Sequence, residues 1–74
     1  MMTEKEFIKE VHRFAFNMCI AHKDPRIKAL AQSSEFLSEL TSTVQCHANR
    51  VLDRTAHRAS ELAKDVFHIV IGSL

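Results

Sequence analysis

The stretch with the densest set of chemically versatile side chains is "QCHANRVLDRTAH", residues 45–57. It holds one cysteine, two histidines and two arginines, and a third arginine, Arg58, follows it directly. Thiolate and imidazole groups bind zinc or act in catalysis, whereas arginines on one helix face bind carboxylates and phosphates. Each of these chemistries needs its residues at a particular spacing, so the spacing decides which one the stretch supports.

A metal site is poorly supported by the positions of the histidines and cysteines. His47 and His57 are ten residues apart, which is about 15 Å along a helix, so one ion cannot bind both. Cys19 and His22 form the one pair at ligand spacing, and they would need Cys46 or His47 from across a bundle to complete tetrahedral zinc. Residues of this kind are more commonly part of a core edge. We therefore expect no metal and no cofactor.

Catalysis has equally little support. Cys46 and His47 are adjacent, so on a helix their side chains point about 100° apart. Asp53 and His57 stand four residues apart, a spacing that is more typical of a surface pair than of a catalytic dyad. The sequence has no glycine-rich phosphate loop, paired-carboxylate motif or nucleophile elbow. We expect the protein not to be an enzyme.

The arginines form the most suggestive pattern in the stretch. Arg50, Arg54 and His57 share one face of a continuous helix, with Arg58 at its edge. Such a face can bind an acidic protein surface or, in a dimer that doubles it, a nucleic acid. Aromatic stacking residues and a helix-turn-helix spacing are absent from it. Three acidic residues interrupt or adjoin it: Asp53, Glu61 and Asp65.

The composition indicates one small helical domain over residues 1–74. The chain has 46% hydrophobic residues but only one Gly and one Pro, which favours an all-α fold over disorder. A net charge of +1 gives no long-range attraction for polyanions. The apolar run "VFHIVIGSL" is too short for a membrane span, which needs roughly 20 residues. Two cysteines and an opening unlike a secretory signal lead us to expect a cytoplasmic protein.

The first helix is predicted over about 3–23. Thr3 and Glu6 have the spacing of a capping box, in which each side chain hydrogen-bonds to the backbone of the other residue. Apolar residues then recur at helical steps, at Phe7, Val11, Phe14, Met18 and Ala21. The pattern predicts an amphipathic helix with one apolar face.

A tight corner is predicted at 23–25, within "HKDPRIK". Asp24 is well placed to cap a second helix, because its carboxylate can accept hydrogen bonds from free backbone amides. Pro25 then occupies the first helical position, where its missing N–H costs nothing. The two helices should meet at this corner.

The second helix is predicted over about 25–71 as one long element. Its apolar stripe has a mean step of about 3.7 residues and continues without a change of phase. Two places could interrupt it, one near Ser33 and one near Ser42, since serine is a favoured N-cap. A break at Ser42 would give a monomeric three-helix bundle, and this alternative stays open. The unbroken phase favours the single long helix.

The unequal lengths of the two helices predict a dimer. A helix over 25–71 would be about 70 Å long, whereas the first helix covers only about 30 Å. Exposing several large aliphatic side chains forgoes about 1.5–3 kcal/mol each. We therefore expect a helical hairpin that pairs as a dimeric four-helix bundle. Its predicted interface comprises Val51, Leu52, Ala59, Leu62, Val66, Ile69 and Val70.

The predicted function is that of a small interaction module which binds a larger protein and modulates or inhibits it, as inhibitors from phages and mobile elements do. Phe16 and Ile20 stand four apart on the side of the first helix away from Phe14, and they form either a second buried face or a partner-binding patch. The alternative is a dimeric nucleic-acid-binding regulator that uses Arg50, Arg54 and Arg58. The candidate partner-binding residues are Phe16, Ile20, Arg50, Arg54, His57 and Arg58.

Overall fold

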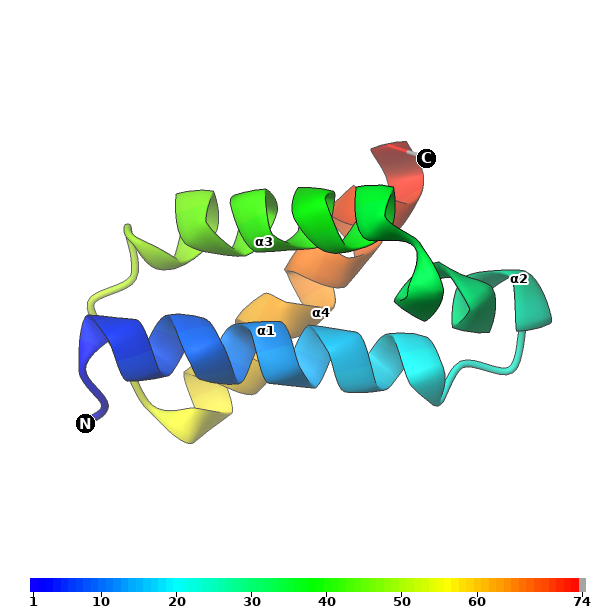
Figure 1. The fold of residues 1–74 in the computed structure, drawn as a ribbon. Helices are drawn as coiled ribbons and strands as arrows, with labels where there is room; N and C mark the ends of the chain where they lie inside the picture. Colours follow the sequence, from blue (N-terminus) through cyan, green and yellow to red (C-terminus); the bar gives the residue numbers. More distant parts are fainter. Residues whose placement is uncertain (74) are drawn as a thin grey trace.

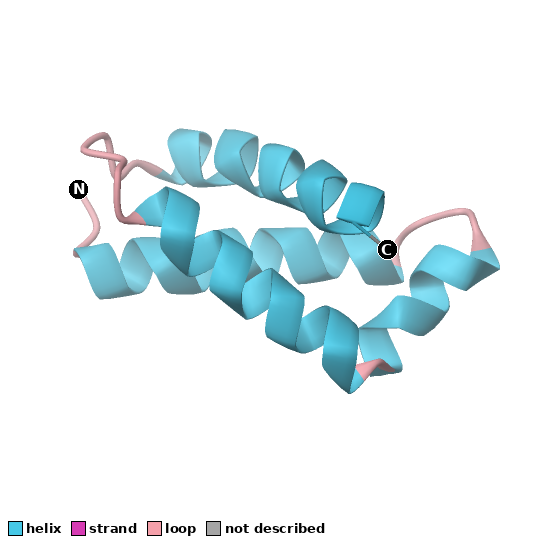
Figure 2. Ribbon diagram, turned by 90° about the horizontal axis from the view of Figure 1, so that it is seen from above, coloured by secondary structure: helices cyan, strands magenta, loops and turns pink. Residues whose placement is uncertain are grey.

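The computed structural model describes residues 1–73, which form four α-helices and one 3₁₀ turn, as the all-α prediction requires. The elements are α1 (Glu4–Ile20), α2 (Pro25–Ala29), η1 (Leu30–Gln32), α3 (Ser34–Ala48) and α4 (Ala56–Ser73). Helices α1 and α3 pack side by side, and α4 crosses both of them (Figure 1). Loops form the corners between helices and the short N-terminal segment (Figure 2). No helix in this part of the chain has both the length and the hydropathy that a bilayer crossing requires.

The predicted start of α1 is confirmed. The Thr3 hydroxyl accepts a hydrogen bond from the Glu6 N–H at 3.2 Å, and the Glu6 carboxylate accepts one from the Thr3 N–H at 3.0 Å. The helix ends at Ile20, three residues before the predicted end. In the corner that follows, the imidazole Nδ1 of His22 accepts a hydrogen bond from the Asp24 N–H at 3.0 Å.

The predicted corner at Asp24 and Pro25 is also confirmed. The Asp24 carboxylate accepts from the Arg26 N–H at 2.9 Å, and Pro25 occupies the first turn of α2. The same carboxylate pairs with the Arg26 guanidinium at 3.1 Å. The hydrogen bonds of Arg26 lower the pKa of Asp24 below its ordinary value of 3.8. The carboxylate therefore stays charged at the positive end of the short helix.

The single long helix over 25–71 is wrong, because the chain leaves the helical path twice. The first break is the one anticipated near Ser33, whose hydroxyl accepts from the Phe36 N–H at 3.2 Å and caps α3. The second lies at 49–55 and not at Ser42, which is inside α3. Thr55 starts α4 by accepting the Arg58 N–H at 3.2 Å.

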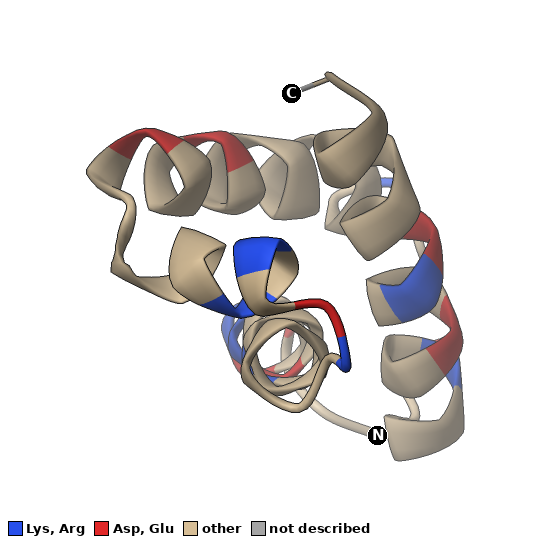
Figure 3. Ribbon diagram, turned by 90° about the vertical axis from the view of Figure 1, so that its right-hand side faces the viewer, with Lys and Arg blue, Asp and Glu red and all other residues tan. Residues whose placement is uncertain are grey.

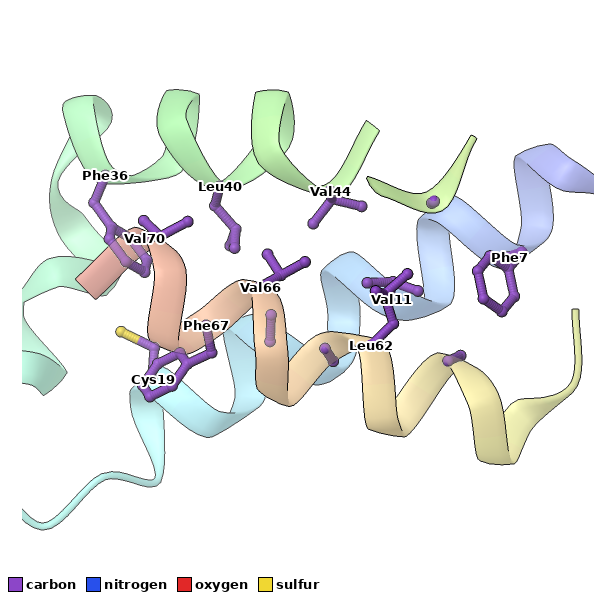
Figure 4. Packing of buried hydrophobic residues seen from close by; sticks show 14 residues of the cluster. Phe7, Val11, Cys19, Phe36, Leu40, Val44, Leu62, Val66, Phe67 and Val70 are labelled. Atoms are coloured by element: carbon purple, nitrogen blue, oxygen red, sulfur yellow. The ribbon is translucent and has the colours of Figure 1, made fainter. Parts of the chain in front are cut away.

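The second break allows the chain to cover its own apolar stripe. Helix α4 folds back across α1 and α3, and all three contribute side chains to one core. Side chains from the three helices point toward one another in Figure 4. The buried core residues are Phe7, Val11, Ala15 and Cys19 of α1, Phe36, Leu40, Val44 and Ala48 of α3, and Ala59, Leu62, Ala63, Val66, Phe67 and Val70 of α4.

This core removes the reason for which a dimer was predicted. Four of the seven residues assigned to the dimer interface, Ala59, Leu62, Val66 and Val70, are buried against this chain's own helices. Covering them therefore needs no second copy. The packing of α1, α3 and α4 in one chain resembles the alternative three-helix bundle, although the second break lies later than that alternative placed it.

Candidate functional site

An open cleft of about 610 Å³ lies between the end of α3 and one face of α4. We call it the α3–α4 cleft. Its apolar part consists of Val51, Leu62 and Ile69, from the loop and from α4. Its polar part consists of Arg50, Arg58, Asp65, His47 and His68. The cleft therefore combines an apolar floor with basic walls.

Helical spacing on α4 brings its cleft residues together. Arg58, Leu62, Asp65 and Ile69 follow one another at steps of four, three and four residues, so they share one face of the helix. Leu62 is 5% exposed, and Ile69 is 44% exposed. The floor thus leads from the edge of the core to the open surface, where an incoming apolar side chain can contact it.

Backbone hydrogen bonds after the end of α3 position the side of the cleft that lies opposite α4. After α3 ends at Ala48, the Arg50 N–H donates to the His47 carbonyl at 3.3 Å, and the Val51 N–H donates to the Ala48 carbonyl at 3.1 Å. These short turns hold Arg50 and Val51 beside α4 instead of continuing the helix. The cleft exists because the chain breaks at this point.

The charges of the cleft favour an anionic ligand. Two guanidinium groups, Arg50 and Arg58, face one carboxylate, Asp65, which leaves one net positive charge when the histidines are neutral. Figure 3 shows basic and acidic residues alternating along α4, the helix that ends at the C label. The ion pairs of residues 1–73 are Arg13–Glu10, Arg26–Asp24 and Arg54–Glu4, and His57 forms a further one with Glu61 only if its imidazole is protonated. Arg50 and Arg58 take part in none of them, so both can bind a carboxylate of a partner.

The predicted Arg50–Arg54–Arg58 face is wrong as a continuous helix face, because Arg50 and Arg54 lie in the loop between α3 and α4. Arg54 Nη2 lies 3.7 Å from the Oε2 of Glu4, at the start of α1. His57 also points elsewhere, since its Nε2 lies 3.6 Å from the Glu61 carboxylate. The structure therefore keeps Arg50 and Arg58 together in the cleft and separates Arg54 and His57 from them.

Phe16 and Ile20 occupy a different part of the surface. Phe16 is half-buried and lines a hollow between α1 and α3 together with Leu37. Ile20 is 47% exposed at the end of α1. The two residues thus contribute to a face that is separate from the α3–α4 cleft.

The remaining residues of the predicted dimer interface stay near the surface. Leu52 is 84% exposed in the loop before α4, and Val51 is half-buried in the cleft. Ile69, near the end of α4, is 44% exposed.

The cysteines and histidines do not converge on one point. Cys19 is buried, its thiol donates to the Ile27 carbonyl at 3.0 Å, and burial raises the pKa of this thiol. Cys46 is exposed on α3. Within residues 1–73, no group of three or more His, Cys, Asp or Glu side chains is arranged to hold a metal ion.

Sequence reasoning missed three members of the cleft, His47, Asp65 and His68, as binding residues. The four-three-four spacing from Arg58 to Ile69 was a signal that could have placed Asp65 beside the arginine. The position of His68 depends on the break before α4, which the periodicity did not reveal.

No protein-family model, curated protein or solved structure matches this chain. Its function is therefore inferred from the residues of the cleft and their surroundings.

Proposed function

We propose that the protein is a non-enzymatic interaction module that binds an acidic segment of a larger protein in the α3–α4 cleft and thereby modulates or inhibits that protein. The observation that carries the proposal is the pairing of an apolar floor with two arginines that have no carboxylate partner among the described ion pairs. Such a surface is suited to a peptide segment that has both apolar and acidic side chains.

The chemistry of the cleft defines the partner segment. An aliphatic or aromatic side chain of the partner would contact Leu62 and Ile69, and burying such a side chain contributes about 1.5–3 kcal/mol. A partner carboxylate would bind Arg50 or Arg58 through the two parallel hydrogen bonds that a guanidinium can donate. Arginine is enriched among the residues that carry most of the energy of protein interfaces.

A non-enzymatic role is supported by the positions of the candidate catalytic side chains. Cys46 and His47 are neighbours on α3, so their side chains leave the helix in different directions, and His57 lies beside Glu61 instead of Asp53. An inhibitory role is supported by the small size of the domain, because a small domain can inhibit a larger protein by binding an acidic surface and blocking access to it. Inhibitors encoded by phages and mobile elements are often small in the same way, which is a class-level analogy. Free thiols at Cys19 and Cys46 suit the reducing cytoplasm.

The second candidate is a nucleic-acid-binding regulator that acts as a dimer. It is favoured by Arg50 and Arg58, which lie together in one cleft, and by the exposed apolar side chains of Leu52 and Ile69, which a second copy could cover. Asp65 in the cleft and the pairing of Arg54 with Glu4 weaken this candidate, because both reduce the positive charge available to phosphates.

The experiment is affinity capture from the native host with wild-type protein and with the double variant Arg50→Glu/Arg58→Glu. We expect one host protein to be captured by the wild type and lost with the double variant. The matched control is Lys64→Glu/Lys28→Glu, which makes the same change of charge at exposed positions outside the cleft. Capture that survives the double reversal in the cleft contradicts the proposal.

An electrophoretic shift with a random duplex at low salt tests the second candidate. A shift that the cleft variant abolishes and the control variant retains would favour nucleic-acid binding over protein binding. Light scattering on the same samples reports whether the chain associates with itself.

A further inference from the structure

A second concave surface runs between α1 and α3, on a different part of the molecule from the α3–α4 cleft. It consists of two adjoining hollows of about 370 Å³ and about 350 Å³, which share Lys9 and His12. Its floor is formed by Ile8, Phe16 and Leu37, together with the buried side chain of Val44. We call it the α1–α3 groove.

The rim of this groove carries positive charge from one helix. Lys5 and Lys9 stand four residues apart on α1, and neither takes part in an ion pair among the described residues. Like charges at this spacing repel each other on a helix, so an anion bound between them relieves an existing repulsion. Arg13 adds a third cation to the rim, although Glu10 holds it at 2.7 Å.

A contact between side chains joins the two helices that form the groove. The Oγ1 of Thr41 on α3 lies 3.3 Å from the Nε2 of His12 on α1. The same hydroxyl donates to the Leu37 carbonyl at 2.9 Å, so it is left as the acceptor for an imidazole N–H. The two helices are thus joined at the middle of the groove while its two hollows stay accessible.

The geometry points to an acidic amphipathic helix of a partner protein as the ligand of the α1–α3 groove. From Lys5 to Phe16 the groove extends about 16 Å along α1, which corresponds to about three helical turns. An incoming helix places an apolar stripe on such a floor, with side chains at i, i+3, i+4 and i+7. Glutamates or aspartates flanking that stripe would face Lys5 and Lys9.

Two other occupants fit the groove less well. A lipid surface is broad and flat, so it cannot fill a concave floor between two helices. A second copy of the chain could supply acidic side chains from α3, where Glu35 and Glu39 are exposed four residues apart. That face has no exposed large hydrophobic side chain among the described residues, so it lacks the apolar stripe that the floor of the groove needs. The α1–α3 groove therefore gives the module a second binding surface, independent of the α3–α4 cleft, and allows it to hold two acidic segments together.

The test uses a labelled synthetic peptide with leucines at i, i+3, i+4 and i+7 and glutamates at the flanking positions. Fluorescence anisotropy measures its affinity for the full chain, and amide chemical shifts of the ¹⁵N-labelled protein locate it. We expect shifts along residues 5–16 and 37–45. Lys5→Glu/Lys9→Glu should weaken binding at least tenfold, because the new carboxylates repel the glutamates of the peptide. Both lysines are exposed, so the fold should persist. Circular dichroism checks that persistence.

Two control variants show whether the peptide binds in this groove and through these lysines. Lys28→Glu/Lys64→Glu makes the same change of charge elsewhere and should leave the affinity within twofold. Arg58→Glu disrupts the α3–α4 cleft alone and should also leave it unchanged, so failure of the proposed function does not decide this inference. Equal weakening by both lysine pairs, peptide shifts confined to the α3–α4 cleft, or binding to phosphatidylserine vesicles without binding to the peptide would each overturn it.

Discussion

The Oε2 of Glu4 lies 3.7 Å from the Nη2 of Arg54, which joins the start of α1 to the loop that precedes α4. Next to this pair, the Met2 N–H donates to the Arg54 carbonyl at 3.0 Å. The Arg54 Nε is buried without a hydrogen-bond partner. The N-terminal segment thus holds the loop at 49–55, and this loop sets the direction of α4.

Removing the charge of Glu4 tests the strength of this link. Both side chains of the pair are partly exposed, so solvent screens their attraction and Glu4→Gln should lower the free energy of unfolding by less than about 1 kcal/mol. The loss should shrink in high salt. Glu35→Gln is the matched control, since Glu35 is also in the first turn of a helix but has no ion pair among the described residues. Urea titration of the three proteins compares them, and equal losses would show that the pair with Arg54 contributes nothing.

Substitutions of two leucines in the predicted dimer interface distinguish a core formed within one chain from a core formed between two chains. Leu62→Ala should lower the free energy of unfolding by about 2–5 kcal/mol, because Leu62 is 5% exposed and its truncation leaves a cavity. Leu52→Ala should change it by about 0.5 kcal/mol or less, because Leu52 is 84% exposed. Urea unfolding at two protein concentrations measures both. A midpoint that rises with concentration, together with a large loss in Leu52→Ala, would restore the dimer interface.

The position of the second break can be tested by substituting two residues, Thr55, which caps α4, and Ser42, which the sequence offered as a cap. Thr55→Ala should cost about 1 kcal/mol, since the Thr55 hydroxyl accepts from the Arg58 N–H at 3.2 Å at the start of α4. Ser42→Ala should be neutral or slightly stabilising, because alanine has the higher helix propensity and Ser42 lies inside α3. Thermal unfolding followed by circular dichroism gives both values. The reverse order would place the break at Ser42.

Acid should destabilise the fold through Glu6. The Thr3 backbone N–H, followed by its hydroxyl, lowers the pKa of Glu6 below its ordinary value of 4.5. A carboxyl with a lowered pKa in the folded state stabilises the protein fully above its unfolded pKa, and this stabilisation is lost as the pH falls through the folded pKa. The melting temperature of the wild type should therefore decline below about pH 4.5 more steeply than that of Glu6→Gln. Parallel declines would exclude a contribution from the capping box.

The two thiols should differ in reactivity. Cys46 is exposed on α3 and should react rapidly with a thiol reagent at pH 8. Cys19 is buried, and burial raises the pKa of its thiol, so it should react only at the rate at which the structure opens. Cys46→Ser isolates the slow reaction, and mass spectrometry assigns the modified residue. Rapid labelling of Cys19 in native protein would show that its part of the core is open.

Local features were predictable from the sequence because their partners are a few residues apart. The reciprocal bonds of Thr3 and Glu6 depend on one turn of chain, as do the Asp24 cap before Pro25 and the Ser33 cap of α3. The amphipathic character of α1 and α4 also follows from spacing alone. These features determined the all-α class and most of the helix starts.

The course of the chain after Ala48 was decided by tertiary packing. Residues 49–55 contain neither Gly nor Pro, and the apolar phase continues through the break, so the periodicity did not reveal that α3 ends there. A stripe specifies which side chains must be buried but not which surface buries them, because hydrophobic burial has no directional preference. Folding α4 back buries Leu62, Val66 and Val70 within one chain. That same fold brings Arg50 to Arg58 and moves Arg54 to Glu4, so the candidate site is a property of the packed structure.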